Sequence, residues 1–143
     1  MNVINIIRQL KRLYPNKTII ENKNDKGVTT EIICEIDPTE LHPNHSTAIA
    51  IIDSSTIHYH KVITETYKVL KGKLTILKYD SEKRVYDEYT LNKGKAITIK
   101  PGEIHSNKGK TTWVEILSKP GWVIGDYYNL EIILKKYLKR DNV

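Results

Sequence analysis

The chain has little cysteine and no long apolar run. Cys34 is its only cysteine, so an intramolecular disulfide is impossible, which favours a reducing, cytoplasmic setting. No segment approaches the ~20 apolar residues that a membrane-spanning helix needs, so we expect no membrane partner. The N-terminus carries Arg8, Lys11 and Arg12 in an amphipathic pattern without a small-residue cleavage site, so we expect no signal peptide.

Positive charge is spread along the chain. The 23 lysines and arginines exceed the 17 acidic residues, which gives a net charge of +6. The one local cluster, Lys135 to Arg140, falls on an expected C-terminal amphipathic helix, where a solvated face is the simpler account. There is no helix-turn-helix or aromatic–basic stacking motif, so we expect no nucleic-acid partner. A positive field would raise the local concentration of an anionic small substrate, such as a phosphorylated or carboxylated sugar.

Three of the five histidines and one glutamate are spaced so that their side chains can meet. Side chains alternate along a strand, so His58 and His60 point to one face and Tyr59 to the other. The two histidine Cα atoms are then about 6–7 Å apart, close enough for both imidazoles to reach one ion at about 2.1 Å. If the strand that begins at Glu65 folds back beside the first, Glu65 faces both histidines across the sheet. His105 can join them only through tertiary folding.

The sequence around these residues resembles the two motifs of the cupin family. It reads H-x-H-x4-E-x6-G over 58–72 and G-x5-K-P-G-x2-H-x-N over 94–107. The match covers about fifty residues of the chain. Ile52, Lys100 and Gly109 stand where cupins usually have glycine, proline and asparagine. None of these departures removes a ligand.

The resemblance implies a fold, a metal site and an assembly. The fold is mainly β, a cupin-type double-stranded β-helix (jelly-roll barrel) with an N-terminal and a C-terminal α-helix. The metal ligands are His58, His60, Glu65 and His105, and they would hold one divalent transition metal: Mn, Fe, Ni, Co, Cu or Zn. An octahedral ion with these four ligands keeps two positions open for a small-molecule substrate. Small cupins commonly pair, so we expect a homodimer.

Three functions use such a site. We favour sugar or sugar-phosphate isomerisation or epimerisation by metal-assisted enolisation. This reaction needs a base, and the candidates are Tyr67, on the face of Glu65, and Glu115. The alternatives are an Fe(II)-dependent dioxygenase and a non-catalytic small-molecule-binding cupin. The sequence leaves Glu115 with two placements, either solvent-facing with Val114 inward or in the pocket beside Trp113.

The periodicity of apolar residues predicts one cupin domain over residues 1–143. Apolar residues recur at helical spacing from Val3 to Tyr14, and Pro15 stops the run. We expect flanking helices over about 2–14 and 129–140 and a barrel core over about 17–118. Turn signals separate the short β-type runs of that core, which are 18–21, 29–36, 47–53, 57–60, 65–70, 73–79, 84–91, 96–100 and 111–118.

Three further polar residues have more than one interpretation. His42 and His45 lie in a proline-flanked loop, where histidines are usually exposed, although a loop over the barrel mouth could bring one near the metal. Asn107 is two residues after His105 and on the same face. Its amide could orient a ligand or substrate, or it could make an ordinary hydrogen bond at the strand end.

Overall fold

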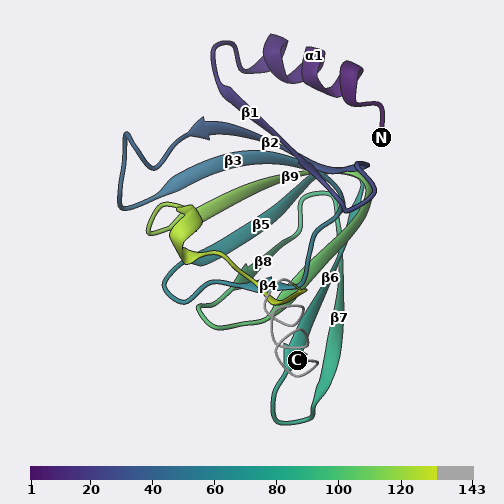
Figure 1. Cartoon of the computed structure of the whole chain (residues 1–143), viewed down its shortest axis with the longest axis vertical. Helices are drawn as coiled ribbons and strands as arrows, with labels where there is room; N and C mark the ends of the chain where they lie inside the picture. The colour runs from purple at the N-terminus through teal and green to yellow at the C-terminus, as the bar shows by residue number, and fades with distance from the viewer. Residues whose placement is uncertain (132–143) are drawn as a thin grey trace, which may run out of the picture.

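The computed structural model describes residues 1–131 as a strongly curled antiparallel sheet with one helix outside it (Figure 1). The elements, in chain order, are α1 (Val3–Leu13), β1 (Thr18–Lys23), β2 (Thr29–Asp37), β3 (Ser46–Ser54), β4 (His58–Tyr59), β5 (Thr64–Lys71), β6 (Lys73–Asp80), β7 (Val85–Asn92), β8 (Ala96–Ile99), β9 (His105–Lys119), the 3-10 helix η1 (Ile124–Asp126) and β10 (Tyr128–Asn129).

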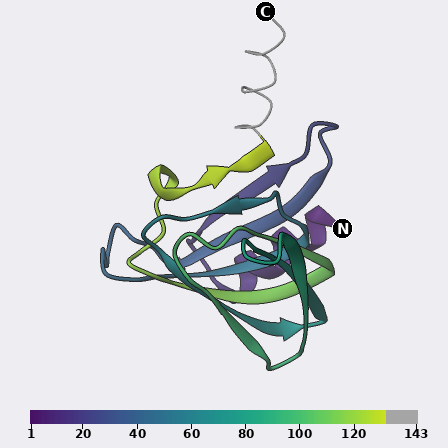
Figure 2. The same cartoon turned by 90° about the horizontal axis from the view of Figure 1, so that it is seen from below.

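Strand β9 connects several strands of the sheet through its pairings. Four strands, β3, β4, β5 and β6, pair with it antiparallel along its length. A single long strand can serve so many neighbours only if the sheet bends around it, and the curl is visible in both views (Figures 1 and 2). The short strand β4 lies between β9 and β10. This arrangement places β4 beside β10, so that residues 58–59 lie next to residues 128–129.

Alternation along the strands separates an inner from an outer face. Ala50 of β3 pairs with Val114 of β9, and both belong to the core inside the curl. Their neighbours Ile51 and Trp113 also pair, but they lie in a second apolar cluster on the outer face. Inner-face residues of β2, β3, β5 and β9 therefore form the lining of the barrel.

Helix α1 covers the outer cluster. Its buried residues Ile6 and Leu10 pack with residues of β2 and β3, including Cys34. Asn2 caps the helix by accepting a hydrogen bond from the N–H of Asn5 at 3.2 Å. Cys34 is fully buried under the helix, as expected for a small core residue.

Most of the predicted elements are confirmed. The helix predicted over 2–14 is α1, and each predicted β-type run corresponds to one strand. Strand β9 begins at His105 rather than at 111. The second predicted helix, 129–140, lies mostly outside the described residues, and Asn129 belongs to β10. That residues 1–143 form one domain stays a prediction. Within residues 1–131, no helix has the length and apolar character that crossing a bilayer requires.

A candidate metal centre

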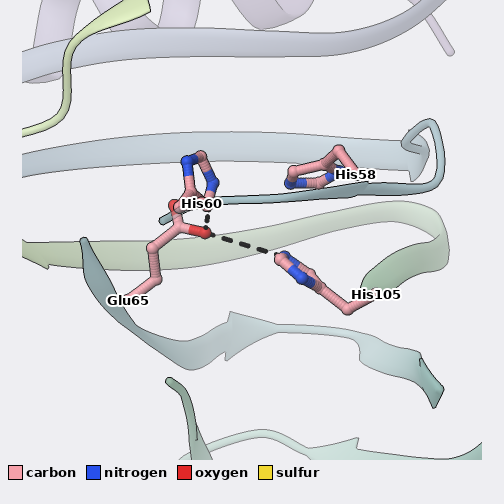
Figure 3. Close-up of side chains that lie close together, drawn as sticks. All are labelled: His58, His60, Glu65 and His105. Atoms are coloured by element: carbon pink, nitrogen blue, oxygen red, sulfur yellow. Dashed lines mark ion pairs between the residues drawn. The ribbon is translucent and has the colours of Figure 1, made fainter. Parts of the chain in front are cut away.

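Four buried polar side chains converge inside the barrel. His58 lies in β4, His60 directly after it, Glu65 in β5 and His105 at the start of β9. None of them is more than 5% exposed. Their ligand atoms all lie within 4.8 Å of one another, and Figure 3 shows the four side chains pointing toward a common centre. The structure thus brings together the four residues that the sequence predicts as metal ligands.

The strand pairings that position Glu65 differ from the one considered in the sequence analysis. His58 is the cross-strand partner of His105, which explains their meeting. Pairing of the His58 strand with the Glu65 strand was the condition under which Glu65 would face both histidines, and it is not met, since β4 pairs with β9 and β10. Strand β5 pairs with β8 and β9. Glu65 is therefore positioned through β9 and through the turn that follows His60.

Each imidazole is oriented by a backbone carbonyl. Nδ1 of His58 lies 2.7 Å from the carbonyl oxygen of Thr56, and Nδ1 of His60 lies 2.7 Å from that of Asp126. Nδ1 of His105 lies 3.0 Å from the carbonyl oxygen of Glu103. A carbonyl oxygen can only accept, so in each neutral ring the proton is on Nδ1. The Nε2 atoms are left with lone pairs, which is the tautomer that a metal ligand needs.

The Nε2 atom of His60 is an unsatisfied buried atom. It lies 3.0 Å from Oε1 of Glu65, but it has no hydrogen-bond partner among the described residues. A buried nitrogen without a partner is costly. A divalent transition metal among the four ligands would remove this cost. Three imidazoles and one carboxylate are ligands that such an ion prefers.

The charges of the centre also suit a cation. Burial raises the pKa of Glu65, but the adjacent His105 and His60 side chains outweigh it and hold the pKa well below its ordinary range. Burial, together with the nearby His105, lowers the pKa of His58 to about 4. At neutral pH, Glu65 is therefore a carboxylate and His58 a neutral imidazole. These are the protonation states in which both groups bind metal.

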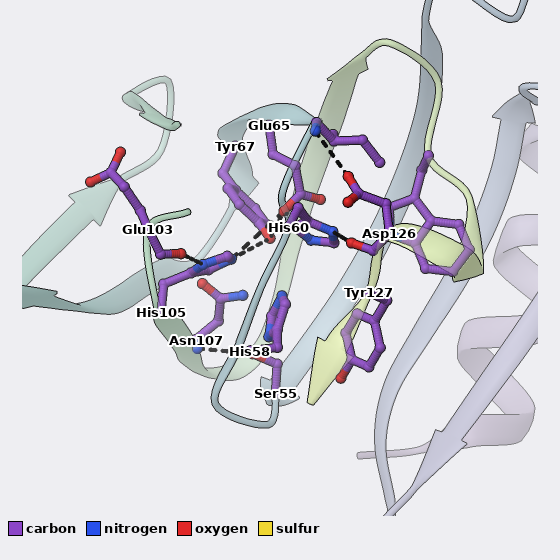
Figure 4. Close-up of polar contacts among 12 residues, drawn as sticks. Ser55, His58, His60, Glu65, Tyr67, Glu103, His105, Asn107, Asp126 and Tyr127 are labelled. Carbon is purple, nitrogen blue, oxygen red and sulfur yellow. Dashed lines mark hydrogen bonds and ion pairs between the residues drawn. The ribbon is translucent and has the colours of Figure 1, made fainter. Parts of the chain in front are cut away.

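Asp126 supports the centre and was missed by sequence reasoning. Its carbonyl accepts a hydrogen bond from Nδ1 of His60. Its carboxylate accepts hydrogen bonds from the backbone N–H groups of the three residues that follow His60. These donors are Lys61 at 2.9 Å, Val62 at 3.1 Å and Ile63 at 2.9 Å. Burial raises the pKa of Asp126, but these hydrogen bonds outweigh it and lower the pKa below its ordinary value. Figure 4 shows Asp126 on the far side of His60 from Glu65. No motif in the sequence marks this residue.

Two other expected site residues lie at the centre. The hydroxyl of Tyr67 donates to Oε1 of Glu65 at 3.1 Å, and Tyr67 is 2% exposed. Burial, together with the Glu65 charge, raises the pKa of Tyr67 well above its ordinary value. Asn107 is buried and lines the same cavity, while its backbone N–H donates to Ser55 Oγ at 2.9 Å. Its side-chain Oδ1 has no hydrogen-bond partner in the described part of the chain.

The structure does not bring Glu115 to the site. Its strand partners are Lys68 of β5 and Ile49 of β3. Ile49 belongs to the outer cluster under α1, so Glu115 is on the outer face. Val114 is the inward residue. The position of Glu115 on the outer face therefore contradicts its candidate catalytic role. Of the two placements considered for Glu115, the one with Val114 inward is correct.

A cavity of about 780 Å³ opens from the centre. His58, His60 and Glu65 line it, together with Tyr67 and Asn107. Its opposite wall comes from β1 and β2. Tyr127 also lines it, with its ring centroid 5.0 Å from that of His58. A small molecule in the cavity can thus reach three of the four candidate ligands, His58, His60 and Glu65.

No protein-family model matches the chain, and no curated protein matches it. Solved structures do. The Streptomyces nucleoside dehydratase Pac13 has a TM-score of 0.66 at 11% identity, over 81% of this chain and 86% of that one. Oxalate decarboxylase from Bacillus subtilis has a TM-score of 0.66 at 13% identity, over 87% of this chain. This second match covers only 35% of the decarboxylase.

KdgF from Halomonas sp. is a third similar structure. Its TM-score is 0.55 at 15% identity, over 65% of this chain and 82% of that one. Identities this low show the fold alone. All three are cupin-fold proteins, so the expected cupin-type barrel is confirmed. The buried His/His/Glu/His group fits the metal site expected of a single-domain cupin.

Proposed function

We propose that this chain is a metal-dependent cupin enzyme that isomerises or epimerises a small hydroxy-carbonyl compound, a sugar derivative. The observation that carries the proposal is the opening of a buried metal-ligand set into a cavity of about 780 Å³. A purely structural metal site is closed by its protein ligands, whereas a catalytic one keeps access for a substrate. The cavity has room for a molecule of sugar size.

The ligand set defines what the protein contributes. A divalent ion held by His58, His60, Glu65 and His105 would polarise a substrate carbonyl and so ease removal of a proton from the neighbouring carbon. Tyr67 was expected as a base. Because its pKa lies well above the ordinary value and its hydroxyl donates to Glu65, we propose that it positions that carboxylate instead.

We also propose the finer features that the sequence suggested. Within residues 1–131, β1 pairs with β2 alone, so its other edge is open, and a second copy of the chain in a homodimer would cover such an edge. A buried free thiol at Cys34 is compatible with a cytoplasmic setting.

The test is a substrate screen with metal-loaded protein, with and without oxygen. Isomerase chemistry is redox-neutral, so turnover should survive strict anaerobiosis and should incorporate deuterium from D₂O into the product. Turnover only with Fe(II), with stoichiometric oxygen consumption, would replace the proposal with the dioxygenase. Ligand binding without turnover in either condition would instead favour the non-catalytic binding protein.

A further inference from the structure

Glu31 is an inward-facing carboxylate that the metal centre does not use. It lies on β2 opposite Ile52 of β3, and Ile52 belongs to the inner core. Its side chain lines the same cavity as His58, His60 and Glu65. Asn22 of β1 donates from Nδ2 to Oε1 of Glu31 at 2.9 Å. The carboxylate is therefore held at the cavity wall formed by the first two strands.

In the metal-free protein, the surroundings of Glu31 bring its pKa close to neutral. Burial raises its pKa to about 7; the hydrogen bond from Asn22 opposes this shift, and the Glu65 charge adds to it. A proton-transfer group works best when its pKa is close to the working pH. The other ionisable side chains that line the cavity are Glu21, Lys23, Glu35, Asp37, His58, His60, Glu65, Tyr67, Tyr127 and Glu131.

The cavity is acidic although the chain is basic. Among the described residues that line it, six carry carboxylates, whereas Lys23 is the one lysine or arginine and His58 and His60 are the two histidines. The ammonium of Lys23 lies 3.9 Å from Glu21, so its charge is partly offset. A phosphate or carboxylate group on a substrate would meet like charge in most of this space.

Resting on the proposed function, we propose that Glu31 is the proton-transfer residue and that the acidic cavity selects neutral or cationic polyhydroxy substrates. Free sugars and amino sugars are the chemical class, in place of the anionic sugars that the net charge suggested. Glu31 takes the proton from the carbon beside the carbonyl as that C–H bond breaks, and the electron pair moves toward the carbonyl oxygen. The proton returns to the former carbonyl carbon while a hydroxyl proton passes between the two oxygens. The product is an isomer, and no oxidant or reductant is consumed.

The test compares Glu31→Gln with Glu115→Gln, in metal-loaded, full-length protein. Glu115 is a matched control because it lies on the outer face. Glu31→Gln should lower deuterium exchange into a turned-over sugar by ~10²–10⁴-fold. Its metal content and its calorimetric affinity for that sugar should stay close to wild type. Glu115→Gln should behave as wild type in all three measurements.

Two results would overturn this proposal while leaving the proposed function standing. One is wild-type exchange in Glu31→Gln. The other is tighter calorimetric binding of sugar phosphates than of the matching free or amino sugars. If the wild-type protein exchanges no proton with any sugar, the proposed function itself fails, and the role of Glu31 fails with it. The binding preference still decides the selectivity in that case, because it needs no turnover.

A second cluster of metal-ligating side chains includes Asp37, a residue of the cavity wall. Asp37 ends β2 and lines the cavity, and His42 and His45 follow in the next loop. The Nε2 atom of His42 lies 3.2 Å from Oδ1 of Asp37, and that of His45 lies 3.3 Å from Oδ2. The two imidazoles are stacked, with ring centroids 4.9 Å apart. His42 is exposed, as its loop position suggested, and His45 is half-buried.

The loop holds these groups in place. Leu41 donates its N–H to the carbonyl of Pro38 at 3.1 Å, and His45 donates to that of His42 at 3.1 Å. Gly121 donates to the carbonyl of Pro43 at 3.0 Å, which ties the loop to the segment after β9. The three ligand atoms lie within 4.8 Å of one another. Two atoms that bind one ion at about 2.1 Å are at most about 4.2 Å apart, so small side-chain rotations would suffice.

We infer that Asp37, His42 and His45 form a second, solvent-exposed site for a divalent transition metal. Two imidazoles and one carboxylate suit Zn²⁺, Ni²⁺, Co²⁺ or Cu²⁺, and water would complete the coordination. The site is separate from the buried centre in its ligands and in its exposure. It would place a cation beside the acidic cavity mouth.

Titration with Zn²⁺, followed by calorimetry and native mass spectrometry, tests this site without reference to activity. Wild-type protein should bind two equivalents, and a His42→Ala, His45→Ala double variant should bind one. Glu40→Gln is the matched control in the same loop and should bind two. One equivalent at saturation in wild-type protein, or two in the double variant, would show that the cluster forms ion pairs only and would overturn the assignment.

Discussion

The carbonyl oxygen of Asp126 accepts a hydrogen bond of 2.7 Å from Nδ1 of His60. The carboxylate of the same residue accepts the backbone N–H groups of the turn that joins His60 to Glu65. One buried residue thus fixes the ring orientation of one metal ligand and the path of the chain to the next. The geometry of the centre therefore depends on Asp126, although Asp126 is not one of the four candidate metal ligands.

The first prediction follows from this relationship. Asp126→Asn replaces an acceptor carboxylate by an amide, which cannot accept from all three N–H groups. Metal affinity should fall by about 10–100-fold, and the free energy of unfolding should fall by about 1–3 kcal/mol. Competition with a chelator and urea unfolding measure the two effects.

Asp80→Asn is a matched control for that variant. Asp80 also accepts backbone N–H groups in a turn, from Glu82 at 2.9 Å and Lys83 at 3.1 Å. Its turn joins β6 to β7, and its side chain does not take part in the metal-ligand cluster. Asp80→Asn should leave metal affinity unchanged. Wild-type affinity in Asp126→Asn would contradict the supporting role.

The second prediction concerns the buried centre itself. One transition-metal ion should bind tightly there per chain, and alanine at His58, His60 or His105 should lower its affinity at least tenfold. Removing the ion with a chelator should lower the melting temperature, because an ion that binds only the folded state stabilises it. Elemental analysis and thermal unfolding check both. Less than a tenth of an equivalent after reconstitution would refute a metal centre.

How much of the site the sequence predicted depends on the range of each interaction. His58 and His60 could be grouped because strand alternation is a local rule that holds before tertiary contacts form, whereas Glu65 was grouped with them through a strand pairing that the structure does not show. His105 could be added only through the motif. The role of Asp126 could not be predicted from the sequence, because it comes from backbone hydrogen bonds to a turn more than 60 residues away in the chain.

The fold was predictable in its elements and less so in its pairings. Apolar periodicity located α1 and nearly every strand of the sheet. The partners of β4 were not predictable, since a two-residue strand carries too little pattern to select between neighbours. The face of Glu115 depended on the register of β9 against β3 and β5. Register is a tertiary property, and a one-residue slip exchanges the two faces.

The third prediction concerns assembly. Among residues 1–131, one edge of β1 has no partner strand, and such an edge favours pairing with another chain, so we expect a homodimer in solution. Light scattering at micromolar concentration should give twice the mass of the 16.6 kDa chain. A proline at an outward N–H of β1 should shift the mass toward that of one chain. A monomeric mass for the wild-type protein would refute this prediction.

The fourth prediction concerns pH and Glu31. Burial raises its folded-state pKa from the ordinary 4.5 to about 7, so between these values the folded state binds more protons than the unfolded state. The contribution of Glu31 to stability is therefore fully present at low pH and is lost as pH rises toward 7. Glutamine keeps the neutral form at every pH. In metal-free protein, Glu31→Gln should match wild type near pH 4 and exceed it by about 1–3 kcal/mol at pH 8.

Thermal and urea unfolding of both proteins across this range measure the difference directly, and charges elsewhere in the chain cancel in it. Glu115→Gln, on the outer face, should show no comparable trend. Adding a divalent metal should shrink the difference at pH 8, because positive charge beside Glu65 favours the ionised form of Glu31. A stability difference that does not change between pH 4 and pH 8 would mean that Glu31 is fully solvated in the folded protein. Its role as the proton-transfer group at neutral pH would then lose its physical basis.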